Sequence, residues 1–370
     1  MEKVLLEDCC EILDSMRVPI TASDRVEGPY PYYGANGIQD YVAEYIFDDE
    51  LVLLAEDGGN FGSKERPIAY RVSGKCWVNN HAHVLKPKEG MDVDYLCYSL
   101  MFYDVGGMVN GATRQKLTQA AMRQMQIPKR SMEEQRNIVN LLGKVVSIKE
   151  QRQRELLTLD ELIKARFVEM FGDVIRNDKH WPCYLFEEIA DSRLGKMLDS
   201  KKQTGKCSFP YLANYNVQWF RFETDNLNKM DFDEKDKKEF ELRNGDLLVC
   251  EGGEIGRCAI WHDEVQPCYF QKALHRVRCD ISLIIPEYLA CWFKYNCEHG
   301  GFSAIEGAKA TISHLPGAKM KKLQVTVPPI DMQVTFGEFI KQVDKSKVAV
   351  KKALDEAQLL FDSLMQEYFG

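Results

Sequence analysis

The chain has 370 residues, which suits about two domains of roughly 150 residues with a connecting segment and is too long for one ordinary core. Its apolar content of 45% and charged content of 28% are typical of a soluble globular protein, and its net charge of −8 argues against a protein that simply coats nucleic acid. The 12 cysteines are scattered without a C-x-x-C spacing, which argues against a disulfide or zinc framework and fits a reducing compartment.

We expect a cytoplasmic protein that is neither secreted nor in contact with a membrane. The first ten residues, "MEKVLLEDCC", lack a basic segment followed by an apolar one. No stretch reaches the about 18 uninterrupted apolar residues that a membrane-spanning helix needs.

Residues 1–131 form the first predicted domain, which contains the glycine loop "AEDGGNFG" (55–62). A Walker A loop would continue as Gly-Lys-Ser/Thr, whereas Ser63 and Lys64 follow Gly62. The adjacent glycines also fail the G-x-G-x-x-G dinucleotide pattern. Because strand-like sequence follows, we interpret the loop as a turn between strands, where glycine adopts positive φ or permits close backbone approach.

Aromatic and amide side chains are interleaved in "YPYYGANGIQDY", upstream of this loop. Tyr32, Tyr33 and Asn36 could read the edges of DNA bases. They could equally be core aromatics and a turn asparagine, and the sequence does not choose between these readings.

A basic segment, residues 105–130, closes the first domain and carries no acidic residue, unlike the chain as a whole. Basic side chains on a loop of small residues suit phosphate contact. We therefore assign Thr113, Arg114 and Lys116 to DNA binding. The alternative is a solvated face near a domain junction.

A long helix is predicted over residues 132–173. Its apolar residues recur at steps of three and four, with charged residues between them, as in the seam of a coiled coil. The seam includes Ile138, Leu142, Val145, Leu156 and Phe167.

The second half of the chain repeats the first. "PYLANYNVQ" (210–218) matches "PYYGANGIQ" at a shift of 179, and "VCEGGEIG" (249–256) matches the first glycine loop at a shift of 194. The final helix matches the central one at a shift of 198. Residues 174–330 are thus a second domain and residues 331–370 a second long helix. The matching seam contains Phe336, Ile340, Val343, Leu354 and Phe361.

The candidate DNA-binding residues of the second domain occupy the matching places. Asn214 and Asn216 lie in "YLANYNVQWFRF", and a second acid-free basic segment covers residues 307–323. From that segment we assign Lys309, Thr311, Ser313 and His314 to DNA binding.

The repeat predicts an α+β fold. Two mixed α/β domains, related by a pseudo-twofold axis, are expected to be held apart by two long antiparallel, coiled-coil-like helices that pack on each other through their seams. Two long helices packed on separate domains are the alternative.

We find no sequence sign of a catalytic centre. His81 and His83 bracket one alanine in an expected strand, but no cluster of Cys, Asp or Glu completes a metal site. A nucleophile elbow and a paired-carboxylate motif are missing as well. "VPPI" (327–330) lacks the polar and aromatic residues of an amino-methyltransferase motif and is better explained as a stiff linker.

The whole chain resembles the specificity (S) subunit of a type I restriction-modification system. The resemblance is carried by two domains that each end in a Gly-Ala/Ser-Thr-type loop, a Pro-containing linker and a Glu-Gln-type helix start. Here these are "GATRQKLTQAAMRQMQIPKRSMEEQRNIVNLL" and "GAKATISHLPGAKMKKLQVTVPPIDMQVTFGEFI". The first copy departs from the pattern at Lys129–Ser131 and the second at Asp331–Gln333.

The resemblance implies a non-catalytic DNA-binding subunit with no cofactor of its own. Each target-recognition domain would read one half of an asymmetric, bipartite double-stranded site, and the helices would set the spacer and dock two methyltransferase (M) subunits. Restriction (R) subunits would join them, and S-adenosylmethionine, ATP and Mg²⁺ would bind on these partners only. A partner in which modification and nuclease activities are fused is equally compatible.

Two other functions compete with this one. A coiled-coil scaffold with two protein-binding domains and no DNA role is disfavoured by the two acid-free basic segments. A nucleotide-using transferase built on the glycine loops is disfavoured by their failure to match either phosphate-binding pattern.

Overall fold

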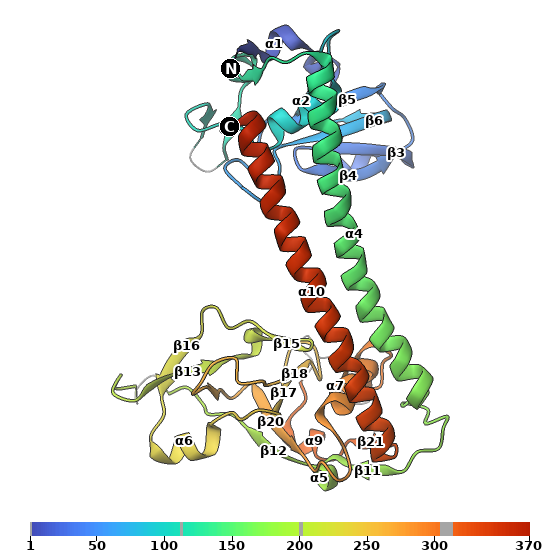
Figure 1. The fold of residues 1–370 in the computed structure, drawn as a ribbon, viewed down its shortest axis with the longest axis vertical. Coiled ribbons are helices and arrows are strands. Elements are labelled where there is room, and N and C mark those ends of the chain that lie inside the picture. The colour runs from blue at the N-terminus through green and yellow to red at the C-terminus, as the bar shows by residue number, and fades with distance from the viewer. Residues whose placement is uncertain (1, 112–113, 200–202, 304–313) are drawn as a thin grey trace. The chain divides into compact units, whose positions relative to one another are not determined.

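The computed structural model describes residues 2–111, 114–199, 203–303 and 314–370 (Figure 1). The chain forms two compact units. Unit 1 comprises Met1–Gln153 and Lys351–Gly370, and unit 2 comprises Arg154–Val350. Each long helix therefore starts in one unit and ends in the other.

Unit 1 is built on a six-stranded sheet with the order β2-β7-β5-β6-β3-β4. Neighbouring strands are antiparallel except β3 and β6, which are parallel. The strands are β2 (Cys10–Ile12), β3 (Glu27–Gly34), β4 (Gly37–Val42), β5 (Phe47–Ala55), β6 (Ala69–Val78) and β7 (Ala82–Pro87).

Shorter elements complete unit 1. Two small antiparallel pairs are β1 (Lys3–Leu5) with β10 (Gln126–Pro128), and β8 (Val109–Asn110) with β9 (Lys116–Leu117). The helices are α1 (Leu6–Cys9), α2 (Val93–Met101) and α3 (Gln119–Arg123). Asp92 caps α2 by accepting hydrogen bonds from the backbone N–H groups of Asp94 and Tyr95.

Unit 2 repeats this plan with shorter strands. A four-stranded sheet has the order β12-β20-β17-β18, and a three-stranded sheet has the order β16-β13-β19, in which β13 and β19 are parallel. These strands are β12 (Ala190–Leu194), β13 (Ser208–Leu212), β16 (Asn228–Asp231), β17 (Leu247–Cys250), β18 (Cys258–Ile260), β19 (Tyr269–Phe270) and β20 (Leu274–Cys279).

The remaining elements of unit 2 flank these sheets. β11 (Cys183–Leu185) pairs with β21 (Gln324–Thr326), and β14 (Val217–Gln218) pairs with β15 (Arg221–Phe222). The helices are α5 (Phe186–Ile189), α6 (Glu234–Phe240), α7 (Pro286–Glu298) and α9 (Gly317–Met320). Pro286 occupies the first position of α7. Proline is favoured at this position because a backbone N–H there would have no partner inside the helix.

The long helices are α4 (Met132–Phe171) and α10 (Ile330–Phe369), each of 40 residues. Ser131 and Glu134 start α4 with reciprocal hydrogen bonds between side chain and backbone, a capping box. Pro328 and Pro329 precede α10. The ring of a proline disfavours helical backbone angles in the residue before it, so the helix does not continue on that side.

The two helices pack antiparallel within each unit. In unit 1 the start of α4 and the end of α10 share one core, which contains Leu142 and Phe361. In unit 2 the end of α4 and the start of α10 share another, which contains Phe167 and Phe336. The predicted α+β class with two long antiparallel helices is confirmed.

No helix in the described part of the chain is long and apolar enough to cross a membrane.

Candidate nucleic-acid interface

The basic loop of unit 1 is held beside the glycine loop by strand pairing. Lys116 forms a β-bridge with Asp57, and the Leu117 N–H donates to the Glu56 carbonyl at 2.7 Å. Arg114 Nη2 lies 2.7 Å from Asp57 Oδ1, and Lys116 Nζ lies 2.9 Å from Glu56 Oε1. The side chains of Arg114 and Lys116 are 60% and 50% exposed. Two cations are thus presented to solvent and paired with acids that a phosphate could replace.

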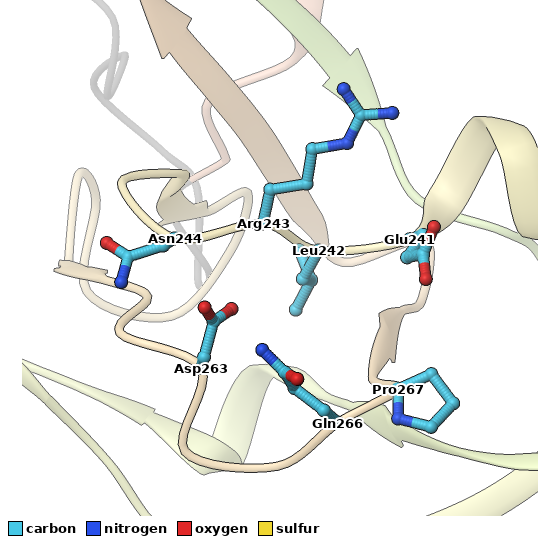
Figure 2. Close-up of a pocket in the computed structure, with 7 residues that line it drawn as sticks. All are labelled: Glu241, Leu242, Arg243, Asn244, Asp263, Gln266 and Pro267. Atoms are coloured by element: carbon cyan, nitrogen blue, oxygen red, sulfur yellow. The ribbon is translucent and has the colours of Figure 1, made fainter.

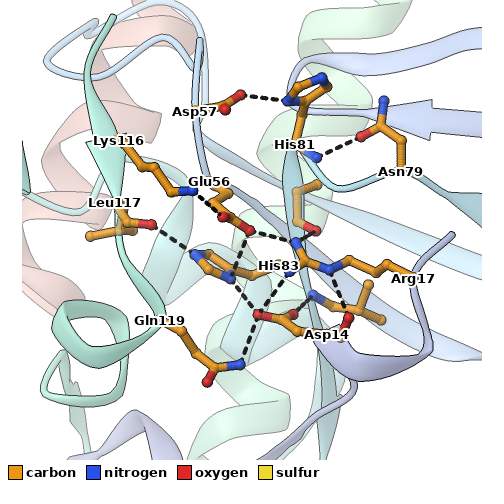
Figure 3. Close-up of polar contacts among 12 residues, drawn as sticks. Asp14, Arg17, Glu56, Asp57, Asn79, His81, His83, Lys116, Leu117 and Gln119 are labelled. Atoms are coloured by element: carbon orange, nitrogen blue, oxygen red, sulfur yellow. Dashed lines mark hydrogen bonds and ion pairs between the residues drawn. The ribbon is translucent and has the colours of Figure 1, made fainter. Parts of the chain in front are cut away.

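A buried ionic network supports this loop (Figure 3). His83 Nδ1 lies 2.6 Å from Asp14 Oδ2, and His83 Nε2 lies 2.9 Å from the Leu117 carbonyl. Arg17 donates to Glu56 at 2.6 Å, and Gln119 donates to Asp14 at 3.0 Å. Both ring nitrogens of His83 thus have a partner, one a carboxylate and the other a backbone carbonyl. The network anchors β9, and with it the basic loop, to the sheet.

The pKa values of the two network acids follow from these contacts. Burial acts to raise the pKa of Asp14, but the hydrogen bond and charge of His83 outweigh it and hold that pKa below its ordinary value. Burial likewise acts to raise the pKa of Glu56, and hydrogen bonds from Lys116 and Arg17 lower it further than burial raises it. Both acids are therefore ionised at neutral pH.

The ligand atoms of Asp14, Glu56 and His83 lie within 4.8 Å of one another, as in a metal site. Arg17 and Lys116, however, already bind the Glu56 carboxylate, and His83 already uses both ring nitrogens. A cation would have to displace these groups, so the cluster is better described as an ionic network.

Unit 2 holds its matching segment in the same way with fewer ionic partners. His275 Nε2 lies 3.1 Å from the Leu315 carbonyl, and the Leu315 N–H donates to the Glu251 carbonyl at 2.6 Å. His314, which is exposed, forms a β-bridge with Gly252. Burial lowers the pKa of His275, and the charge of Glu251 only partly opposes this. Thr113, Lys309, Thr311 and Ser313 lie outside the described residues.

The structure corrects the register of the glycine loops. Leu117 pairs with Glu56 and Leu315 with Glu251, so the start of the loop repeats at a shift of 195 rather than the predicted 194. Gly58 and Gly253 then correspond, and both have positive φ, 62° and 83°. The predicted shift of 194 holds at the end of the loop, where Gly62 and Gly256 both have a φ of 78°, so only the start of the loop is one residue out of register. The interpretation as a turn that needs positive φ agrees with the structure.

Asn36 and Asn214 fasten these glycine loops. The Nδ2 of Asn36 donates to the Gly58 carbonyl at 3.0 Å, and the Nδ2 of Asn214 donates to the Gly252 carbonyl at 2.8 Å. The Oδ1 of Asn214 accepts from Arg257 at 2.7 Å. Both asparagines therefore shape the loop, and a base would have to compete with these bonds.

Two predicted DNA-binding residues are core residues instead. Tyr32 is 1% exposed, its hydroxyl bonds the Ile20 backbone, and Arg25 lies 4.3 Å above its ring. Asn216 is 3% exposed and bonds the backbone of Ala213 and Glu223. Because neither side chain can reach a groove, both assignments are corrected.

Tyr33 is only half-buried, and its ring packs beside that of Tyr70 at 5.8 Å between centroids. This contact explains the orientation of the ring, and contact of Tyr33 with DNA stays a prediction.

An exposed aromatic that the sequence assignment missed lies on the hairpin of β14 and β15. Phe220 is 50% exposed and has a φ of 61°, a strained value for a bulky residue. Its N–H donates to the Cys258 carbonyl at 2.9 Å, which fixes the turn against β18. Trp219 beside it carries Lys294 4.4 Å above its ring. Strain combined with exposure is typical of a functional site. The signal in the sequence was an aromatic pair where a turn favours Gly or Asn.

Two open depressions lie in unit 2. The first, of about 570 Å³, is bordered by polar and charged side chains of two loops, among them Glu241, Arg243 and Asp263, and suggests no particular ligand (Figure 2). The second, of about 910 Å³, is lined by His275, Lys272 and Lys321 among others. Asp233, Asp236 and Glu239 also line it, so the depression has mixed charge.

The predicted seam residues are packed inside the units. Ile138, Leu142, Val145, Phe167, Phe336, Val343 and Phe361 are all at most 5% exposed, and Leu156, Ile340 and Leu354 are partly buried. Packing between the helices within each unit accounts for these side chains.

Comparison with known proteins identifies the family. The sequence profile of the type I restriction modification DNA specificity domain matches residues 1–158 and 181–358. A putative type I restriction enzyme specificity subunit from Haemophilus influenzae is 27% identical over 334 residues, which are 89% of this chain and 83% of that protein. The EcoprrI specificity subunit from Escherichia coli is 25% identical over 115 residues, 31% of this chain and 27% of that protein.

Solved structures share the fold across the whole chain. The type I S subunit from M. genitalium has a TM-score of 0.59 at 14% identity, covering 100% of this chain and 96% of that one. A chain from a structural study of type I complex assembly and conformational transition has a TM-score of 0.58 at 14% identity, covering 100% and 97%. Two profile matches agree with the two predicted repeats. The chain belongs to the type I restriction modification DNA specificity domain family, whose members are non-catalytic specificity subunits of these systems.

Proposed function

We propose that this chain recognises an asymmetric, bipartite double-stranded DNA site, one half with each recognition domain, and docks methyltransferase and restriction subunits there. The observation that carries the proposal is the repeated loop. In both units a segment of the basic region pairs with the glycine loop and is tied by a buried histidine, His83 or His275, to the carbonyl of Leu117 or Leu315.

Phosphate contact would proceed by exchange of partners. In unit 1 a DNA phosphate would take the place of Asp57 at Arg114 and of Glu56 at Lys116, so charge-assisted hydrogen bonds are replaced rather than newly created. Phosphate contacts position the domain, and base edges are read by the neighbouring side chains.

The two domains would read different half-sites because their exposed side chains differ. Unit 1 presents Arg114 and Lys116 beside its glycine loop, whereas unit 2 presents the Phe220 hairpin and Lys272. The same framework with different surface chemistry favours an asymmetric target.

Methyltransferase docking would use apolar side chains that the helices leave exposed. Leu162 on α4 is 45% exposed, and Leu360, its counterpart at a shift of 198, is 50% exposed. Equivalent exposed leucines on the two repeats suit two copies of the same partner. S-adenosylmethionine, ATP and Mg²⁺ would be bound by the partner subunits.

A salt series on the chain with its methyltransferase partner tests DNA binding. We expect the affinity for duplex to fall with salt, and Arg114→Ala and Lys116→Ala to reduce the slope of log K against log salt by about one each. Lys129→Ala is the matched control, because Lys129 is equally exposed in the same basic segment but follows β10, which pairs with β1 and not with the glycine loop. An affinity independent of salt would favour the scaffold function instead.

A further inference from the structure

A buried glutamine joins the start of α4 to the start of α2 in unit 1. Gln135 is 1% exposed. Its Oε1 accepts from the Asp92 N–H at 2.8 Å, and its Nε2 donates to the carbonyls of Gly90 at 2.9 Å and Arg130 at 3.0 Å. The accepted N–H belongs to the capping residue of α2. One side chain therefore holds the recognition domain, the linker and the long helix together.

Gln333 makes the same three bonds in unit 2. It is 0% exposed, its Oε1 accepts from the Ile285 N–H at 3.1 Å, and its Nε2 donates to the carbonyls of Leu283 at 2.9 Å and Pro328 at 2.7 Å. Ile285 occupies the N-cap position of α7, as Asp92 does for α2, but makes no side-chain capping bond. In both units the acceptors are the residue two before the cap and the residue five before the glutamine.

A tyrosine and a phenylalanine complete each joint. The Tyr95 hydroxyl donates to the Pro128 carbonyl at 2.9 Å, and the Tyr288 hydroxyl donates to the Thr326 carbonyl at 2.8 Å. The ring of Phe369 lies 5.3 Å from that of Tyr95, and the ring of Phe171 lies 4.8 Å from that of Tyr288. The end of the other long helix thus closes each joint. We call Gln135, Tyr95 and Phe369, with Gln333, Tyr288 and Phe171, the two glutamine joints.

The second joint also explains a glycine in α10. A Cβ at Gly337 would lie 3.0 Å from Ile285 Cδ1, which is tighter than nearly all real contacts. Glycine there lets α10 approach the start of α7 closely, where Gln333 makes its bonds.

The chemistry of the joint requires glutamine. Its amide supplies an acceptor and two donors, and all three are used by backbone groups in each unit. Glutamate keeps the acceptor but has no N–H to give to the two carbonyls, and leucine satisfies none of the three. Each loss leaves backbone groups without a partner, so the joint should loosen.

We propose that Gln135 and Gln333 are positioning residues that fix the angle of each recognition domain on its long helix, and thereby restrict the spacer between the half-sites. The proposal rests on the proposed function, in which the domains read two half-sites at a set distance. A rigid joint rejects a site with a spacer one base pair too long or short, whereas a loosened joint accepts it.

The test measures methylation rates by the complete complex on duplexes whose half-sites, once mapped for the wild type, carry the mapped spacer or one base pair more or less. We expect Gln135→Leu and Gln333→Leu to lower the preference for the mapped spacer by about tenfold or more, since a displacement near 1 Å can change rates by about 100-fold. The bases preferred in each half-site should stay the same. Gln153→Leu, an exposed glutamine on α4, is the control and should leave the preference unchanged.

A second pair of variants keeps the test decisive if a leucine variant fails to fold. Tyr95→Phe and Tyr288→Phe remove one hydrogen bond and keep the ring contact, so a smaller loss of spacer preference is expected. If the folded variants lose rate equally on all three spacers, the joints serve stability alone and the proposal is overturned. If the wild type itself methylates no split site, the proposed function fails rather than the joint.

Discussion

Each exposed cation at the candidate interface of unit 1 has an acid beside it. Asp57 accepts from Arg114 and lies 2.7 Å from His81 Nδ1, so its charge opposes an approaching phosphate. We predict that Asp57→Asn raises the affinity for duplex of any sequence by about two- to fivefold, the range of an exposed ion pair. A filter or fluorescence titration with a scrambled duplex measures it. A fall in affinity would mean that Asp57 orients Arg114 for DNA instead of competing with DNA.

Asp14 stabilises unit 1 through the buried network. Asp14→Asn removes the carboxylate nearer to His83 Nδ1, at 2.6 Å, and leaves Glu56 at 3.7 Å, and we predict a loss of about 3 kcal/mol in the free energy of unfolding at pH 7, as for other broken buried ion pairs. Because the folded pKa of Asp14 is lowered, its contribution is present above its ordinary pKa of about 4 and is lost as the pH falls through the folded value. Denaturant unfolding at several pH values should therefore show the variant and the wild type converging in acid. A difference that grows in acid would contradict this assignment.

A substitution at Phe220 should affect stability and DNA binding differently. Glycine suits a φ of 61° better than phenylalanine does, so Phe220→Gly should leave the stability of the chain unchanged or slightly raised. If the ring contacts DNA, the same change should weaken specific binding by about tenfold, the order of one lost base–aromatic contact. Melting curves and duplex titrations of the one variant give both values. Unchanged binding would return Phe220 to the role of an exposed turn residue.

For single residues, the sequence indicated candidates by their chemistry but not whether their side chains are buried or exposed. Asn36 and Asn214 were assigned to DNA binding, which stays a prediction, and their amides hold a glycine loop. Tyr32 and Asn216 share a segment with them and are buried. Exposure depends on which face of a strand meets the core, and short mixed segments of aromatic and amide residues carry no period that reveals it.

The long helices are the elements that the sequence predicted best. A seam that recurs at steps of three and four over 40 residues leaves few alternatives, and matching lengths in both repeats support an antiparallel pair. Strand details were less accessible. At the start of the glycine loops the two repeats differ by one residue from the shift that the sequence predicts. Strand pairing sets the register at that position, and the alignment of repeated glycines in the sequence does not reveal it.

Exposed leucines on the helices should carry partner docking and little stability. We predict that Leu162→Lys and Leu360→Lys each remove one methyltransferase subunit from the complex, because each repeat would dock one copy. The mass of the complex, measured by light scattering, reports the loss. Leu157→Lys is the control, since Leu157 is 66% exposed but its counterpart at a shift of 198 is Asp355. Loss of both subunits in the control variant would show that docking does not follow the repeat.

On the scale of the whole molecule, duplication separates framework from specificity. The glutamine joints and the histidine-to-carbonyl bonds recur in both units with matching partners, and an asparagine fastens each glycine loop, at Gly58 in unit 1 and at Gly252 in unit 2. The side chains exposed around them differ. Selection for a new target sequence can therefore alter one domain's surface while leaving the parts that hold it on the helices unchanged.

The central claim is that one chain reads two different half-sites at a fixed separation. Base-resolution mapping of methylated adenines, in cells that express the chain with its methyltransferase subunit, tests it most directly. We predict a split motif of two unlike half-sites with a constant spacer of about one helical turn. A continuous motif, or two half-sites at freely varying distances, would contradict the account.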